Sequence, residues 1–166
     1  MGKVDILKLI KERRSVRKFQ NKEVPMQTIK NSLEAARWAP SGLNNQPWKF
    51  MILEQEEKNS LAEYTKFDQV IKEANKLIIV FLNKEKIYSY KKDLMAIGAA
   101  IQNILIYLQS QDVGSCWLGE IINQAEQVQD KLQIPTELEL AAAIGVGFTQ
   151  EKVEPIPRNS LEELIL

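Results

Sequence analysis

The order of apolar and polar residues along the chain predicts a mixture of helices and buried strands. The spacing predicts helices over residues 4–12, 25–38, 56–63, 94–108 and 124–132. Apolar and β-branched runs predict strands over residues 48–53, 77–82 and 138–146, with a further short apolar run at 116–118. Because the two kinds of element alternate irregularly, the chain fits the α+β or mixed α/β class. No repeat or low-complexity tract divides it, which predicts a single domain over residues 1–166.

The segment 94–108 is apolar on nearly every face of its predicted helix. A helix of this kind is normally buried on all sides, yet a chain of 166 residues has little interior in which to hide one. Gly98, Ala99 and Ala100 would allow another backbone to approach closely. We therefore expect a second subunit to cover part of this helix. Burial inside a single chain is the alternative.

Net charge argues against large polyanionic partners. Lys plus Arg and Asp plus Glu both number 22, so neither a nucleic acid nor a membrane surface is expected as a partner. The charge is nevertheless uneven, because residues 3–18 contain seven basic side chains against two acidic ones. A local basic cluster in a neutral chain fits a small anion such as phosphate. Binding of nucleic acid through this cluster is the rival interpretation.

The content of cysteine and histidine excludes several kinds of site. Histidine is absent and Cys116 is the single cysteine, which rules out histidine-based catalysis, an internal disulfide and the usual zinc sites. No metal site is expected. Charged residues from Lys3 onward leave no signal-peptide core, and no apolar run reaches membrane-spanning length. These features together predict a cytoplasmic location.

Two motifs have the composition of a ligand site. The loop over residues 39–48 lies between a predicted helix and a predicted strand, and is rich in side-chain and backbone amides, with prolines near both ends. It suits a flat ligand that accepts and donates hydrogen bonds, although an ordinary surface turn is the alternative. The second motif, Arg13-Arg14-Ser15-Val16-Arg17, offers bidentate donors that match phosphate geometry. The two motifs together are far more specific than either one alone.

In this combination the chain resembles the FMN-dependent nitroreductase family. The resemblance runs through residues 13–19 and 39–48, and then through 98–103, 114–119, 145–148 and 157–163. It implies an α+β, nitroreductase-like fold in which a mixed, mainly antiparallel sheet is flanked by helices. It also implies an intertwined homodimer with FMN at the subunit interface and an exchanged C-terminal tail, residues 149–166.

The resemblance assigns roles to individual residues. Arg13, Arg14 and Ser15 match positions that hold the FMN phosphate and ribityl chain, Arg17 matches the basic residue beside the flavin pyrimidine, and Arg158 matches a late phosphate-binding arginine. Pro40, Ser41, Gly42 and Asn44 match the loop that reaches FMN from the other subunit. Leu118 and Gly119 match a backbone segment facing N5 and O4 of the flavin. No side chain is assigned as a certain catalytic group, and Arg17 is expected to tune the flavin electrostatically.

The implied function is an NAD(P)H-dependent oxidoreductase with tightly but non-covalently bound FMN. NADH or NADPH would bind transiently, and a nitroaromatic, a quinone or a similar electron-poor compound would be reduced in a ping-pong cycle. The alternatives are a non-catalytic protein that stores or senses FMN, and a relative with another flavin reaction such as reductive dehalogenation. The chain departs from other family members in three ways. It is shorter than the larger members, and it has Ile156 where some members have a lysine. Residues 67–70 also lack the Asn and Lys with which larger members contact the flavin.

Overall fold

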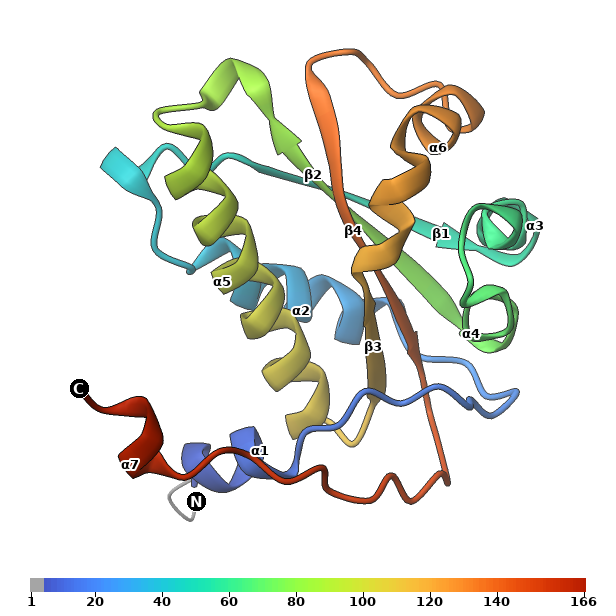
Figure 1. Ribbon diagram of the computed structural model, residues 1–166. Coiled ribbons are helices and arrows are strands. Elements are labelled where there is room, and N and C mark those ends of the chain that lie inside the picture. Colours follow the sequence, from blue (N-terminus) through green and yellow to red (C-terminus); the bar gives the residue numbers. More distant parts are fainter. Residues whose placement is uncertain (1–4) are drawn as a thin grey trace.

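The computed structural model describes residues 5–166 and contains a four-stranded sheet with helices on both faces (Figure 1). Its strands are β1 (Trp48–Glu54), β2 (Lys76–Asn83), β3 (Gly114–Leu118) and β4 (Leu138–Gly147). They lie in the order β1-β2-β4-β3, and each neighbouring pair is antiparallel. The α+β class and the mainly antiparallel sheet are confirmed. A single parallel bridge, between Ser15 and Ser115, lies outside the named strands among the described residues.

The helices largely follow the sequence pattern. They are α1 (Ile6–Glu12), α2 (Met26–Arg37), α3 (Gln55–Asn59), α4 (Asp68–Glu73), α5 (Tyr90–Ser110), α6 (Ala125–Lys131) and α7 (Leu161–Leu164). Val4, at the start of the first predicted helix, lies outside the described residues. The helix predicted over 56–63 is wrong at its end: the Ser60 hydroxyl donates to the Glu57 carbonyl, and α3 stops at Asn59. The pattern missed α4, which is too short for a periodic signal and buries only Val70 and Ile71.

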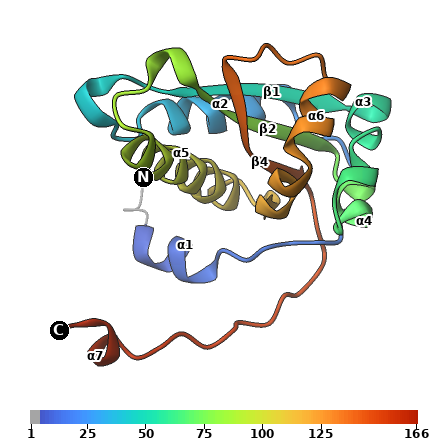
Figure 2. The same cartoon turned by 45° about the horizontal axis from the view of Figure 1, so that its top comes forward.

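The core has two parts, one on each face of the sheet. Every residue of β2 is buried, and successive side chains enter opposite parts. Ile78, Val80 and Leu82 pack against α2 and α5, whereas Leu77, Ile79 and Phe81 pack against α4, α6 and the adjoining turns. Figures 1 and 2 accordingly show α2 and α5 on one side of the sheet and α3, α4 and α6 on the other. A strand covered on both faces explains the continuous apolar run in this segment.

The long helix α5 is only partly buried in the single chain. Ile101 and Ile104 are fully buried, but Met95 is 65% exposed on the opposite side. Met95, Ala99, Gln102 and Ile106 follow one another at helical spacing with exposed or half-buried side chains, and we call this set the α5 strip. A Cβ atom added to Gly98 would meet only open space. Burial on all sides is therefore wrong for one chain. Within residues 5–166, no helix is long and apolar enough to cross a membrane.

Beyond β4, residues 148–160 form no helix or strand, and the tail runs past α1 to the short helix α7 (Figure 1). Its beginning is tied to the segment after α1. The Thr149 hydroxyl donates to the Lys18 carbonyl, and the Glu151 carboxylate accepts from the backbone N–H groups of Arg17 and Lys18. Leu161 and Leu164 in α7 are both 66% exposed. Exchange of this tail with a second chain stays a prediction.

The packing of α5 predicts a large cost for shortening Ile104, whose side chain is fully buried between the helix and the sheet. The variant Ile104→Ala should lower the free energy of unfolding by about 2–5 kcal/mol, because a cavity replaces the lost contacts. Chemical denaturation at a fixed protein concentration measures it. The control Lys91→Ala, at an exposed position of the same helix, should stay within about 0.5 kcal/mol of the parent. If both variants lost the same free energy of unfolding, the burial of Ile104 in α5 would not be a main source of stability.

Candidate functional site

The arginine-rich segment lies against the edge of the sheet. Helix α1 ends at Glu12, and the extended chain that follows runs beside β3, where the Val16 N–H donates to the Ser115 carbonyl at 2.9 Å. The Val16 side chain is buried. Since neighbouring side chains of an extended chain point to opposite sides, those of Ser15 and Arg17 are directed away from the interior. The segment is thus held by the Val16 contacts and by the Glu151 carboxylate, which bonds the backbone of Arg17 and Lys18, and the side chains of Ser15 and Arg17 remain outside these contacts.

A cavity of about 300 Å³ brings together the predicted arginines from both ends of the chain. Its lining residues are Ile10, Lys11, Arg13, Arg14, Ser15, Arg17, Val153, Glu154, Pro155, Ile156 and Arg158. The tail carries Arg158 back to this place after more than a hundred intervening residues, so Arg158 lines the same cavity as Arg13, Arg14 and Arg17. The position at which some relatives carry a lysine is here occupied by the exposed Ile156.

The lining of this cavity is strongly positive, with Lys11 and four arginines against the single carboxylate of Glu154. Among residues 5–166, no ion pair joins any of its four arginines to a carboxylate. Arg14 donates through Nη1 to the carbonyls of Lys11 and Arg13, while its buried Nε has no hydrogen-bond partner. Burial, followed by the charges of Arg158 and Arg14, lowers the pKa of Arg13. Cations held together against their mutual repulsion favour an anion between them.

The strand β3 leads from this cavity to the predicted backbone segment at Leu118 and Gly119. Leu118 ends the strand three residues after Ser115, a rise of ~10 Å along an extended chain. The Leu118 side chain is buried, so only backbone groups are available to a ligand there. Between the two lies the buried Cys116, whose pKa is raised by burial against the opposing effect of Arg17 and Arg13. A protonated, buried thiol is a packing residue rather than a nucleophile.

The loop with Pro40, Ser41, Gly42 and Asn44 has an unusual backbone. Leu43, Asn44 and Gln46 have φ angles of 53°, 54° and 47°, in the left-handed region that non-glycine residues seldom adopt. The Ser41 hydroxyl accepts from the Gln46 N–H at 3.0 Å and helps to close the turn. Together with α5 the loop forms a surface cavity lined by Pro40, Ser41, Gly42, Lys92, Met95, Ala96 and Ala99.

The two predicted halves of the site lie at opposite ends of α5. The loop is bonded to Asp93 near the start of the helix, where Asn45 Nδ2 donates to Asp93 Oδ1 at 2.9 Å. The arginine segment lies near its end, since Arg14 and Gln109 line one shared cavity. The rise of the helix between residues 93 and 109 is ~24 Å. A single chain therefore does not bring Pro40, Ser41, Gly42 and Asn44 to the arginine cavity.

Residues 67–70 offer no free replacement for the missing flavin-contacting side chains. The Asp68 carboxylate pairs with Lys72 at 2.7 Å, and the Gln69 amide donates to Glu73 Oε1 at 2.8 Å, both within α4. Sequence reasoning missed Glu120, which follows Gly119 directly. Its carboxylate accepts from the Thr65 hydroxyl and the Lys66 N–H and so ties the 64–67 loop beside Gly119. A lone glutamate gives no sequence signal for such a contact.

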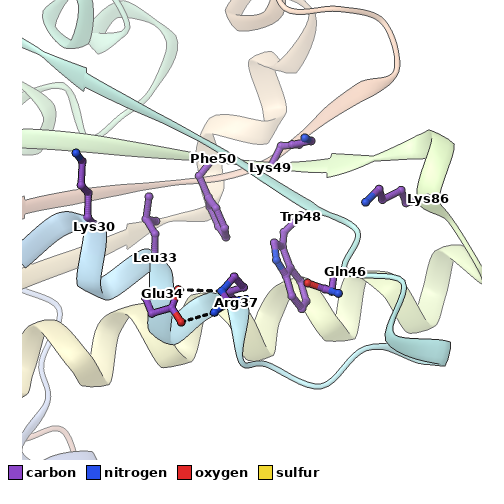
Figure 3. A pocket seen from close by; sticks show the side chains of 9 residues that line it. All are labelled: Lys30, Leu33, Glu34, Arg37, Gln46, Trp48, Lys49, Phe50 and Lys86. Atoms are coloured by element: carbon purple, nitrogen blue, oxygen red, sulfur yellow. Dashed lines mark hydrogen bonds and ion pairs between the residues drawn. The ribbon is translucent and has the colours of Figure 1, made fainter.

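A further cavity of about 400 Å³ lies between α2 and β1 (Figure 3). Its lining residues are Lys30, Leu33, Glu34, Arg37, Gln46, Trp48, Lys49, Phe50 and Lys86. Hydrogen bonds from Arg37 and Trp38 lower the pKa of Glu34 to about 2, so its charge is already balanced within α2. Trp48 is almost fully buried, as core packing requires. This cavity shares Gln46 with the predicted loop and contains no residue of the arginine cavity.

Comparisons with known proteins agree with this arrangement. Residues 10–81 and 56–148 match the sequence model of the nitroreductase family. A protein of Methanothermobacter thermautotrophicus, provisionally named NADH dehydrogenase/NAD(P)H nitroreductase, is 31% identical over 156 aligned positions, and the match covers 91% of this chain and 81% of that protein. The iodotyrosine deiodinase of Thermotoga neapolitana is 28% identical over 179 residues, covering 92% of this chain and 93% of its own.

A solved structure gives the same result in three dimensions. The crystal structure of a provisionally named nitroreductase from Desulfovibrio desulfuricans, in complex with FMN, is 37% identical and superposes with a TM-score of 0.95. The similarity covers 99% of this chain and 97% of that chain. The sequence model matches far more than half of the chain, and the structural match extends over nearly all of it. The chain therefore belongs to the nitroreductase family.

Proposed function

We propose that the protein is a homodimeric, FMN-dependent oxidoreductase that passes reducing equivalents from NADH or NADPH to nitroaromatics, quinones or similar electron-poor acceptors in a ping-pong cycle. The observation that carries this proposal is the cavity in which four arginines meet, none of them in an ion pair among the described residues. The FMN in the Desulfovibrio structure and the name of the archaeal relative support the choice of cofactor and of electron donor.

The residues of this cavity fit the phosphate of FMN. A phosphate dianion accepts several charge-assisted hydrogen bonds, and Arg13, Arg14 and Arg158 offer planar donor groups of matching geometry. The unpartnered Nε of Arg14 is a buried donor that such an anion would satisfy. We assign Ser15 to the phosphate and ribityl chain as well. When bound, FMN would supply the hydride and one-electron chemistry, which explains why a chain without histidine can serve as a redox enzyme.

The ring of the cofactor would lie further along β3. We assign Arg17 to the flavin pyrimidine, and the backbone of Leu118 and Gly119 to the opposite side of the ring system. Arg17 is exposed, and among the described residues its guanidinium donates only to the Ser15 carbonyl, so most of its donors can contact a ligand. A cation held near the pyrimidine favours the more negative, reduced state of the cofactor. We infer that the role of the chain is to bind, orient and polarise the flavin.

We infer that the site is completed by a second copy of the chain. The α5 strip is apolar except for Gln102 and is only partly covered within the single chain, and Gly98 permits close approach of another helix. In a two-fold dimer the same surface meets itself, so two antiparallel α5 helices bring the start of one beside the end of the other. The loop over Pro40 to Asn44 would thereby reach the partner's arginine cavity. The tail 149–166 would extend over the partner, and the whole chain 1–166 would act as one FMN-binding domain.

Two features bear on substrate and location. The similarity to a bacterial iodotyrosine deiodinase favours reductive dehalogenation as the second candidate reaction, because it spans nearly the full length of both proteins. A non-catalytic role in storing or sensing FMN would use the same site without turnover. The single cysteine is buried, which accords with the cytoplasmic location that we propose.

The cofactor and the reaction can be tested with protein purified without added flavin. We expect a yellow protein that releases FMN on denaturation, and whose flavin absorbance bleaches on anaerobic mixing with NADH or NADPH. Subsequent addition of a nitroaromatic, a quinone or a halogenated phenol should restore the absorbance and identify the acceptor class. A protein that binds FMN but does not bleach would be a storage or sensing protein. A colourless protein that takes up no FMN would overturn the proposal.

The role of Arg17 predicts a change in redox potential. A unit charge ~4 Å from the developing negative charge, at an effective dielectric constant of ~20, contributes at most about 4 kcal/mol. For a two-electron couple this corresponds to ~90 mV, so Arg17→Ala should lower the midpoint potential of bound FMN by up to that amount. Arg17→Lys keeps the charge and should retain most of the potential. An unchanged potential in Arg17→Ala, measured by redox titration, would remove Arg17 from this role.

The shared site predicts complementation between subunits. A mixed dimer pairs an Arg13→Gln subunit with an Asn44→Ala subunit, each carrying its own affinity tag. It should bind one FMN with near-parental affinity, since the intact arginines of one subunit meet the intact loop of the other. Both parent homodimers should bind FMN weakly, as they contain two damaged sites. If the site formed within one chain, the mixed dimer would have no intact site and would bind as weakly as its parents.

A further inference from the structure

The buried carboxylate of Asp93 is the centre of a hydrogen-bonded cluster outside the arginine cavity. Asp93 lies in the first turn of α5 and is fully buried. Its Oδ1 accepts from Asn45 Nδ2 at 2.9 Å, and its Oδ2 accepts from the N–H groups of Tyr88 and Ser89 at 2.8 Å each. Burial would raise the pKa of Asp93, but the hydrogen bonds from Asn45, Ser89 and Tyr88 lower it overall. The group is therefore a carboxylate that needs all three donors.

The same cluster fixes the loop over residues 40–46. The Asn45 amide donates both to Asp93 and to the Lys86 carbonyl, the latter at 2.8 Å. Gly42 packs beneath the ring of Tyr88, where an added Cβ atom would lie 2.7 Å from Tyr88 Cδ1. The loop is thus held to the start of α5 by the amide of Asn45 and by a close ring contact.

The backbone of the loop needs such support. Leu43, Asn44 and Gln46 occupy the left-handed region without being glycines, a conformation that persists only where the surroundings impose it. Leu43 is 83% exposed and gains almost nothing from packing. Asn44 is exposed as well. The energy that keeps this conformation must therefore come from the neighbouring contacts of Asn45, Ser41 and Gly42, and the contact of Asn45 ends on Asp93.

We propose that Asp93, acting through Asn45, is a positioning residue that holds Ser41, Gly42 and Asn44 in the shape required by the partner subunit's FMN site. The proposal rests on the proposed function, because it assumes that this loop serves the second chain. According to this proposal, a buried carboxylate at one end of α5 affects cofactor binding in the other subunit. Asp93 itself touches no cofactor, and its effect reaches FMN only through the conformation of the loop.

The isosteric amide cannot preserve both bonds of Asn45. If the new amide at position 93 accepts from Tyr88 and Ser89, its NH₂ group faces the NH₂ group of Asn45, so two donors meet. If the Asn45 amide turns over instead, its Oδ1 accepts from the new NH₂ group but faces the Lys86 carbonyl, and the bond to Lys86 is lost. The exchange Asp93→Asn with Asn45→Asp reverses the polarity and restores one side-chain bond, although the Lys86 carbonyl stays unpaired. Partial recovery in this double variant is the signature of a direct contact.

The first measurement is the affinity of FMN for the reconstituted homodimers. Asp93→Asn should weaken binding at least tenfold, in the range expected when hydrogen bonds to a charged group are lost. The double variant should recover part of this loss. Asp130→Asn, which removes an exposed carboxylate in the last part of α6, is the matched control and should bind like the parent. Asn45→Ala removes the contact from the other side and replaces Asp93→Asn if that variant fails to fold.

The second measurement separates positioning of the loop from general damage. In a mixed dimer of an Asp93→Asn subunit and an Arg13→Gln subunit, one site combines intact arginines with an intact loop. If Asp93 acts on the partner's site, this dimer binds one FMN with near-parental affinity. If Asp93 acts on its own subunit's site, or if the substitution merely loosens the fold, both sites are damaged and no high-affinity binding remains.

The outcomes distinguish the two proposals. Failure of the parent protein to bind FMN contradicts the proposed function. Parental FMN affinity in both Asp93→Asn and Asn45→Ala contradicts the positioning role while leaving the proposed function intact. Weak binding in the mixed dimer of Asp93→Asn with Arg13→Gln, at unchanged melting temperature, overturns the action across the interface. High-affinity binding of one FMN in that dimer, together with partial recovery in the double variant, supports it.

Discussion

The organisation of this protein depends on the length and the one-sided burial of α5. The helix packs through Ala100, Ile101 and Ile104 into the core, and its other side carries the exposed α5 strip. Its two ends hold the two groups of polar residues that the sequence singles out, separated by ~24 Å. A small cofactor cannot bridge that distance within one chain. If both groups belong to one cofactor site, as we propose, a second copy of the chain is needed to complete it, because two-fold symmetry places the start of one α5 helix beside the end of the other.

The arginine cavity illustrates how a neutral protein can hold a strongly cationic site. Burial, and after it the repulsion from Arg158 and Arg14, lowers the pKa of Arg13, which means that the folded chain holds these cations together at an electrostatic cost. The Val16 contact to β3 and the hydrogen bonds of Thr149 and Glu151 hold the segment in place against this repulsion. In the proposed site, a bound phosphate would relieve the repulsion, so this cost would become part of the affinity for the anion.

Sequence patterns predicted the main elements, because β2 is buried on both faces and α2 has a clear apolar face. The patterns failed for two elements. Helix α4 is too short to show a helical period, and α3 ends earlier than predicted because the Ser60 hydroxyl bonds to the backbone. Family resemblance assigned Arg158 and Arg13 to the same phosphate, and the two side chains line one cavity, although their binding role stays a prediction. The contact of Glu120 with Thr65 and the contact of Asp93 with Asn45 join segments far apart in sequence, and no local pattern records them.

A site built from two chains couples three equilibria that are independent in a monomeric enzyme. If FMN contacts the arginines of one subunit and the loop of the other, it binds the dimer and has no complete site on the separated chain. Linkage then requires that FMN stabilises the dimer by as much as dimerisation increases FMN affinity. The conformation of the strained loop is the third equilibrium. Any contact that already holds Leu43 and Asn44 in the left-handed region lowers the entropy that is lost when the cofactor binds. In the proposed site, the buried hydrogen bonds at the start of α5 would thereby contribute to the stability of the fold, to dimerisation and to cofactor affinity.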